Sequence, residues 1–277
     1  MSKLLDISAL GGFILFACSG WATISLILLF VGYSFFHQWI QGSQCQAKER
    51  LDGKTAIITG GTAGIGKEVA RILSSRGARV VIGCRDLVKG RKVVDGIKAH
   101  NPWTDSSTSS GSFITSVTHI LINNAGFYSP SFKNTVDGHE MVFQVNYLGH
   151  FLLVNLLLPL LRVSAPARII NMTSKLNSKN STDFDDVNSE KDFQPKGSYE
   201  KSKVANALFT KELAKRLEGS GVSVYGVNPG STNTALMKSL MPSLPGHAQT
   251  IAEILYGLST KTPREWCADN CQLCLES

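Results

Sequence analysis

Short apolar runs alternate with longer amphipathic stretches along the chain from residue 54 onward. The apolar runs are rich in β-branched residues and have the length of buried parallel strands. They cover residues 54–58, 78–83, 119–122, 168–172 and 222–227. The stretches between them carry the signals of helices, over residues 67–76, 87–98, 138–161 and 198–218. This alternation predicts the α/β class, with a doubly wound parallel sheet.

The alternation fails between residues 99 and 118. Residues 101–112 are mostly small and polar. The interval is too short for a third strand followed by a crossover helix. We therefore expect residues 100–118 to be irregular and the sheet to be incomplete. The edge of the second strand would then be uncovered, which would leave the domain marginally stable.

The first part of the chain has a different pattern, because residues 7–36 contain no charged side chain. As a helix this segment measures roughly 45 Å, longer than the roughly 30 Å hydrocarbon core of a bilayer. It predicts a transmembrane anchor after a tail of residues 1–6, with a polar linker of residues 37–53 leading into a domain of residues 54–277. Lys48, Arg50 and Lys54 follow the anchor, so the positive-inside rule places the domain in the cytosol. The expected location is the endoplasmic reticulum membrane, with a single span.

Composition narrows the choice of partners. The 277 residues carry a formal charge of +7, but no basic block with interleaved aromatic residues, so nucleic-acid binding is not expected. The excess of cations suits a phosphate-rich cofactor or an anionic membrane surface. Three of the six cysteines, Cys267, Cys271 and Cys274, lie close together. They lack a fourth ligand nearby, so we expect free thiols and no metal site.

A glycine-rich turn joins the first predicted strand to the first predicted helix. The turn contains Gly60, Thr62, Gly64, Ile65 and Gly66. Glycines let the backbone approach a ligand closely, and the N-terminus of the following helix attracts a pyrophosphate. An ordinary strand-to-helix turn is the alternative, which the flanking elements make less favoured. The pattern is typical of a Rossmann-type nucleotide site.

The end of the second predicted strand bears on the choice of cofactor. NAD-binding proteins of this type usually carry an acidic residue there, to hold the ribose hydroxyls. Here Cys84 takes that place and Arg85 follows. Arginine suits a 2′-phosphate, so NADP is expected in preference to NAD. The alternative is that Arg85 is a surface charge and that Asp86 only caps the next helix.

Tyr199 and Lys203 are four residues apart on a predicted helix, so they share one face. An ammonium beside a phenol should lower the pKa of the phenol and allow proton exchange near neutral pH. Ser174 follows a predicted strand and can donate a hydrogen bond to the same substrate oxygen. This combination predicts acid–base chemistry on an alcohol or carbonyl group.

Together these motifs resemble the short-chain dehydrogenase/reductase family over most of residues 54–235, and they are most similar to its membrane-anchored retinol dehydrogenase branch. The resemblance implies that Ser174 polarises a carbonyl, Tyr199 is the acid/base, and Lys203 also binds the nicotinamide ribose. Asn146 would hold a water in a proton relay, unless it is a helix residue bonded only to the protein. Further residues expected at the cofactor are Asn124, Ala125, Gly126, Pro229, Gly230 and Thr234.

The predicted function is an NADP-dependent oxidoreductase that interconverts an alcohol and an aldehyde or ketone, with retinol/retinal or another lipophilic carbonyl as substrate. An apolar segment after the last strand is either a substrate lid or a core helix; it contains Leu236, Met237, Leu240, Met241 and Leu244. A homodimer is an option that the sequence leaves open. The alternative function is a catalytically impaired, membrane-anchored variant that serves as a cofactor-binding or interaction module.

Overall fold

The computed structural model describes residues 49–100, 106–109, 117–174, 184–230 and 260–270, with single residues or short runs at 25–34 and 232–257. The chain divides into two compact units, residues 1–42 and 43–277. In the first unit, the described positions 25, 28 and 31–34 are helical. The expected anchor of residues 7–36 otherwise lies outside the described residues.

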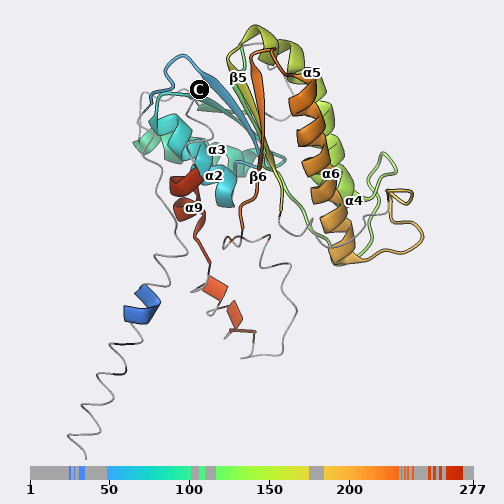
Figure 1. The fold of residues 1–277 in the computed structure, drawn as a ribbon. Helices are drawn as coiled ribbons and strands as arrows, with labels where there is room; N and C mark the ends of the chain where they lie inside the picture. Colours follow the sequence, from blue (N-terminus) through green and yellow to red (C-terminus); the bar gives the residue numbers. More distant parts are fainter. Residues whose placement is uncertain are drawn as a thin grey trace, which may run out of the picture. The chain divides into compact units, whose positions relative to one another are not determined.

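The second unit is built on a parallel sheet whose strand order is β3-β2-β1-β4-β5-β6 (Figure 1). The strands are β1 Thr55–Thr59, β2 Arg79–Gly83, β3 Ser106–Ser109, β4 Ile120–Asn123, β5 Ala167–Met172 and β6 Val222–Val227. β1 pairs with β2 on one side and with β4 on the other. The strand order therefore reverses at β1 and β4, where this class of sheet opens a crevice for a ligand.

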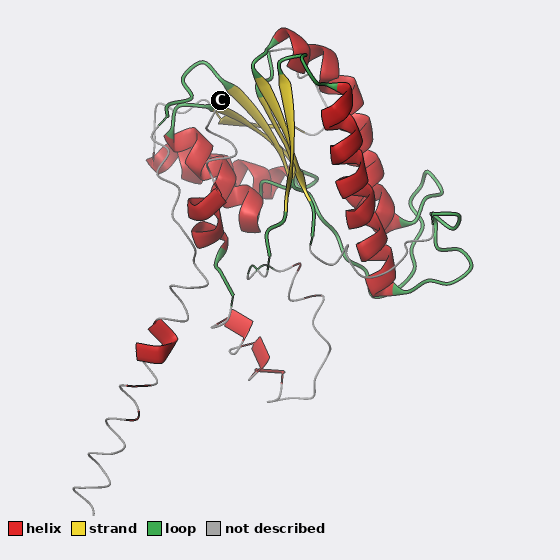
Figure 2. Cartoon of the chain, in the orientation of Figure 1, coloured by secondary structure: helices red, strands yellow, loops and turns green. Residues whose placement is uncertain are grey.

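Helices cover both faces of the sheet (Figure 2). They are α2 Gly64–Ser75, α3 Leu87–His100, α4 Met141–Phe143, the π-helical turn η1 Gln144–Leu148, α5 Gly149–Val163, α6 Pro195–Arg216 and α9 Pro263–Asn270. Side chains of α2, α3 and α9 share one buried apolar cluster, and side chains of α5 and α6 share another. The predicted doubly wound α/β fold is confirmed.

Each central strand supplies both clusters, because successive side chains of a strand point to opposite faces. In β1, Ala56 and Ile58 belong to the α2–α3–α9 cluster, whereas Ile57 belongs to the α5–α6 cluster. Ile58 is fully buried and Ile57 is 2% exposed. This burial on both faces explains why the strands read as continuous apolar runs rather than as alternating patterns.

The expectation that residues 100–118 are irregular, and that the third strand is missing, is wrong at residues 106–109. β3 lies there and pairs in parallel with β2, with Val80 opposite Ser106 and Gly83 opposite Ser109. The edge of β2 is therefore covered. The physical reason is that ladder hydrogen bonds join backbone groups, so an edge strand needs no apolar pattern of its own.

The sequence also predicts no crossover helix before the strand at residues 119–122. In the structure, that helix would lie in the connection from β3 to β4. Only residues 110–119 join Ser109 to Ile120, fewer than a crossover helix needs. The described part of this connection, residues 117–119, is not helical.

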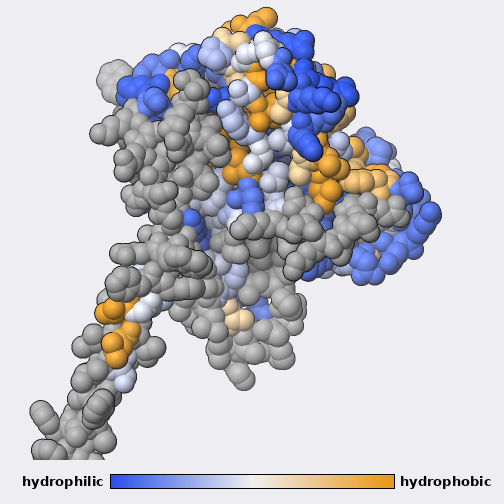
Figure 3. Space-filling view, viewed as in Figure 1, coloured by the Kyte–Doolittle hydropathy of each residue, from blue (hydrophilic) through white to orange (hydrophobic). Residues whose placement is uncertain are grey.

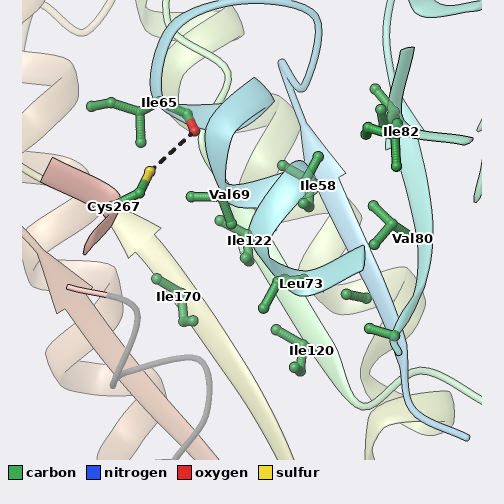
Figure 4. Close-up of a cluster of buried hydrophobic side chains, with 14 of the residues drawn as sticks. Ile58, Ile65, Val69, Leu73, Val80, Ile82, Ile120, Ile122, Ile170 and Cys267 are labelled. Carbon is green, nitrogen blue, oxygen red and sulfur yellow. Dashed lines mark hydrogen bonds between the residues drawn. The ribbon is translucent and has the colours of Figure 1, made fainter. Parts of the chain in front are cut away.

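The helix α9 completes the apolar cluster that α2 and α3 form on one face of the sheet. α9 packs against α2, and its Trp266 and Cys267 are 6% and 1% exposed. The thiol of Cys267 donates a hydrogen bond of 3.7 Å to the carbonyl oxygen of Ile65, which Figure 4 shows beside Val69 and the β-strand isoleucines. Cys267 is thus part of the core, whereas Cys271 and Cys274 lie outside the described residues.

Within the described residues, one helix is long and apolar enough to cross a membrane, over Met141–Val163, and a third of it is buried. This helix comprises α4, η1 and α5. It packs on the sheet through the buried side chains of Val154, Leu157 and Leu161. These contacts account for the apolar residues on the face that packs against the sheet, so the helix belongs to the core of the second unit.

Candidate functional site

A cavity of about 550 Å³ opens at the carboxyl ends of the central strands. It brings together most of the predicted site residues, from segments far apart in the sequence. Those that line it are Gly60, Thr62, Gly64, Ile65, Arg85, Asn124, Ala125, Gly126, Tyr199, Lys203, Pro229, Gly230 and Thr234. Gly66, Asn146 and Ser174 are not among its lining residues.

The glycine turn follows β1 and forms one wall of the cavity. Gly60 and Gly64 have φ angles of 68° and 54°, a region that favours glycine. A Cβ atom on Gly60 would lie 2.9 Å from the Cα atom of Ala125. A Cβ atom on Gly66 would lie 2.6 Å from the carbonyl oxygen of Gly60. The turn therefore packs backbone against backbone, and Gly66 supports the wall from beneath.

The N-terminus of α2 faces this wall without a side-chain cap. Its N-cap residue is Ala63, which makes no capping hydrogen bond, and its first turn holds no acidic residue. The first N–H groups of a helix have no partner within the helix, so they are available to an anion. The uncapped helix and the two left-handed glycines fit the pyrophosphate of a dinucleotide.

The hydroxyl of Thr59, at the end of β1, holds the segment that follows β4. Its Oγ1 accepts hydrogen bonds from the backbone N–H groups of Asn124 and Ala125, both at 3.0 Å. The Asn124 side-chain amide donates in return to the carbonyl oxygen of Thr59 at 2.9 Å. Sequence reasoning named Asn124 and Ala125 but missed Thr59, although Thr59 directly precedes the glycine turn.

Arg85 is expected either to bind a 2′-phosphate or to be a surface charge, and Asp86 to cap the next helix. The carboxylate of Asp86 caps α3 by accepting from the backbone N–H of Lys89 at 3.0 Å. This bond lowers the pKa of Asp86. Arg85 is exposed and lines the cavity together with Lys89. Burial raises the pKa of the neighbouring Cys84 thiol, so no negative charge stands at the end of β2 itself.

Tyr199 and Lys203 lie on α6 and are almost fully buried, at 5% and 4% exposed. The Nζ atom of Lys203 lies 5.6 Å from the centre of the Tyr199 ring and donates to the carbonyl oxygen of Met172 at 3.0 Å. Desolvation lowers the pKa of Lys203 to about 8 and raises that of Tyr199 to about 12. The expected lowering of the phenol pKa by its neighbour is thus outweighed by burial.

A buried carboxylate fixes the start of α6 beside Tyr199. Glu140 is fully buried and caps α4 through the backbone N–H groups of Val142 and Phe143. It also accepts a hydrogen bond of 2.6 Å from the hydroxyl of Ser198. Since Ser198 precedes Tyr199, this bond ties the helix that carries the phenol to the first turn of the facing helix. No pattern in the sequence predicts this contact.

Asn146 lies in η1 and is fully buried. Its side chain accepts from the backbone N–H of Phe127 at 2.7 Å and donates to the hydroxyl of Ser202 at 3.0 Å. Both contacts are with protein groups, and the expected role of Asn146 in a proton relay stays a prediction. Ser174 follows β5 by two residues and is half-buried.

Of the apolar segment expected after the last strand, Leu236 is described and lines the cavity beside Gly126. Met237, Leu240, Met241 and Leu244 lie outside the described residues. Among the residues that the structure describes, no group of His, Cys, Asp and Glu side chains is arranged to hold a metal ion.

Comparison with known proteins agrees with this geometry. The family model described as short chain dehydrogenase matches residues 54–244. Retinol dehydrogenase 12 of Homo sapiens is 40% identical over 236 residues, which are 78% of this chain and 75% of that protein. Retinol dehydrogenase 13 of Homo sapiens is 40% identical over 214 residues, 72% of this chain and 65% of that protein. A Shigella flexneri protein solved in complex with NADP has the same fold, with a TM-score of 0.60, 22% identity, and coverage of 82% of this chain and 92% of that one.

The burial of Lys203 predicts a measurable effect on stability. The folded-state pKa of about 8 lies below the ordinary 10.5, so the unfolded chain binds the proton more tightly. The resulting penalty is fully present below pH 8 and disappears as the pH rises to 10.5. We therefore compare the free energies of unfolding of the wild type and of Lys203→Met. The wild-type value minus the variant value should rise by about 3 kcal/mol between pH 8 and pH 10.5.

Urea denaturation of both proteins at several pH values, without added cofactor, measures this difference. Lys211 lies exposed on the same helix, so Lys211→Met is the matched control and should show no such trend. A wild-type minus Lys203→Met difference that stays constant with pH would show that the ammonium is not desolvated in the folded chain.

Proposed function

We propose that this chain, an oxidoreductase that belongs to the short chain dehydrogenase family, interconverts an alcohol and an aldehyde or ketone with NADP. The observation that carries the proposal is that Tyr199 and Lys203 line the same cavity as the glycine turn. A proton donor and a dinucleotide site in one cavity are the two requirements for reducing a carbonyl group.

The family uses NAD(P), and the residues at the cavity favour NADP. The uncapped N-terminus of α2 would bind the pyrophosphate, and the exposed guanidinium of Arg85 would bind the 2′-phosphate. Asp86 is engaged as the cap of α3 and is also 3.5 Å from the ammonium of Lys89. Its charge is therefore partly balanced, which favours a phosphate at this place. When bound, NADPH supplies the hydride.

The proton chemistry belongs to the residues of this chain. With a pKa raised to about 12, Tyr199 holds its proton at neutral pH and can donate it to the oxygen of a carbonyl substrate. Lys203, with a pKa near 8, can carry a proton in the same pH range and return it toward the phenol. We assign the polarisation of the carbonyl to Ser174 and the relay of protons toward Lys203 to a water beside Asn146.

The substrate that we propose is lipophilic, with retinol/retinal as the first candidate. Two relatives at 40% identity are named retinol dehydrogenases. The cavity of this chain has apolar lining residues in Phe127, Val145 and Leu236. These side chains would contact an apolar substrate, while the polar groups of the site face its oxygen.

We further propose that residues 7–36 anchor the chain in the endoplasmic reticulum membrane with a single span, and that the domain faces the cytosol. The described residues of this segment include Leu28 and Val31, whose side chains are exposed on a helix. A homodimer is proposed through α5 and α6, where Leu152, Leu156 and Leu208 are exposed. Apolar side chains also come to the surface among charged ones in the space-filling view (Figure 3).

Tyr199→Phe should reduce kcat for retinal or a simple aldehyde by at least a thousandfold, because the ring keeps its packing and only the proton donor is lost. NADPH affinity should stay within about threefold of wild type. Steady-state kinetics and fluorescence titration of the full chain in detergent measure the two effects. Tyr128→Phe is the control, since that ring lies 6.4 Å from the Tyr199 ring. Turnover of Tyr199→Phe near the wild-type rate would refute the assignment.

Arg85→Ala should weaken NADPH binding by about tenfold to a hundredfold and leave NADH binding almost unchanged, because only NADPH carries the 2′-phosphate. Titration of both cofactors against wild type gives the ratio. Arg91→Ala removes an exposed cation of α3 that does not line the cavity, so it serves as the control. Equal losses for both cofactors would mean that Arg85 does not recognise the phosphate.

The topology can be tested with a glycosylation motif already in the chain, Asn180-Ser181-Thr182. A cytosolic domain is not exposed to the glycosylation machinery, so Asn180 should stay unmodified in cells. Glycosidase treatment followed by a gel shift, with Asn180→Gln as reference, measures this. A shift in the wild type alone would place the domain in the lumen. The second motif begins at Asn171, which is fully buried in β5, so the folded domain does not present it for glycosylation.

A further inference from the structure

His150 lies near the start of α5, is 5% exposed, and does not line the cavity. Its ring makes two hydrogen bonds that connect different parts of the domain. Nδ1 is 3.0 Å from the carbonyl oxygen of Asn146, in η1. Nε2 is 2.9 Å from the hydroxyl oxygen of Thr59, at the end of β1. The proton chemistry of the proposed function uses neither contact.

The chemistry of these partners fixes the tautomer. A carbonyl oxygen can only accept, so the hydrogen of the ring must be on Nδ1. Burial lowers the pKa of His150 to about 4, with a smaller contribution from the charge of Lys203, so the ring is neutral at pH 7. Nε2 then has a free lone pair, and the hydroxyl of Thr59 must donate to it.

This direction decides what the oxygen of Thr59 can do. A hydroxyl has one hydrogen and two lone pairs. With its hydrogen given to His150, both lone pairs accept the backbone N–H groups of Asn124 and Ala125, each at 3.0 Å. The other acceptor within reach is the carbonyl oxygen of Ile122, at a longer 3.4 Å. His150 thus completes the bonding of a hydroxyl that would otherwise have a weak acceptor.

We propose that His150 is a positioning residue of the cofactor site: by accepting the hydroxyl hydrogen of Thr59, it holds the segment Asn124–Gly126 where that segment lines the cavity. The segment also fixes the glycine turn, because the amide of Asn124 donates to Thr59 and Gly60 carbonyl oxygens. His150 therefore acts on the cavity through Thr59. Only the expected effect of His150 on NADPH binding rests on the proposed function; its effect on the segment Asn124–Gly126 does not.

The tautomer can be read in the wild type without cofactor. Nitrogen-15 chemical shifts of His150 at pH 7 should show a protonated Nδ1 and a bare Nε2. A protonated Nε2 would make the ring the donor and would overturn the proposal. This measurement needs no variant that has to fold.

Two variants separate the two bonds of the ring. His150→Gln can place an acceptor near Thr59, because its side-chain oxygen reaches as far as Nε2. His150→Asn has an amide near the Nδ1 position only, so it can bond to Asn146 but not to Thr59. Both remove the ring, so general packing losses are similar, and urea denaturation checks this.

We expect amide hydrogen exchange at Asn124 and Ala125 to rise about tenfold in His150→Asn, the change for one lost hydrogen bond, and to stay within about threefold in His150→Gln. The NADPH Kd should follow the same order, with kcat changing less than KM. Equal effects in the two variants, or unchanged exchange at both amides, would mean that His150 only fills space.

Thr59→Val completes the test, because it removes the hydroxyl and leaves the imidazole in place. Its exchange rates at Asn124 and Ala125 should rise at least as much as in His150→Asn, because both amides lose their acceptor. Adding His150→Asn to Thr59→Val should raise them no further. Additive effects would show that the two residues act separately. If the wild type binds no NADPH, the cofactor proposal fails, while the tautomer and the amide exchange still decide the role of His150.

Discussion

Two stretches of backbone meet at the carboxyl end of β1 with no room for a Cβ atom between them. Gly60 and Gly66 pack against Asn124 and Ala125 at distances that a side chain would violate. The contact joins the turn before α2 to the segment after β4, at the place where the strand order of the sheet reverses. The cavity, the free N-terminus of α2 and the hydrogen bonds of Thr59 all depend on this close approach.

The other wall of the cavity is electrostatically costly. Lys203 is buried and donates to a backbone carbonyl of β5, which satisfies one of its hydrogens but does not balance its charge. The buried phenol beside it stays protonated for the same reason. A buried ammonium is a poor contributor to folding, but with a pKa of about 8 Lys203 can exchange a proton near neutral pH. The firm packing of α6, through Ser198 and Glu140, holds these two side chains in place.

Features set by apolar pattern could be predicted from the sequence, including the strands at β1, β2, β4, β5 and β6 and the helices between them. The residues of the glycine turn, Arg85, Tyr199 and Lys203 were predicted from local motifs, and most of them line one cavity. β3 was not foreseen, since backbone pairing along β2 leaves no mark in the side chains of residues 106–109. Thr59 and His150 were missed as partners because they are 91 residues apart, and a single polar contact at that distance has no sequence signature. The pKa of Tyr199 was predicted in the wrong direction because burial cannot be read from helical spacing.

The packing of α9 on α2 has a consequence for the order of events during synthesis. The core around Ile65 is closed by Cys267, 202 residues later in the chain. Before α9 is synthesised, the half that carries the glycine turn therefore has one apolar side open to solvent. It reaches its final burial only after α9 has left the exit tunnel. The apolar side of this half is thus exposed throughout the synthesis of the residues between α2 and α9, even though the glycine turn and its strand are made early.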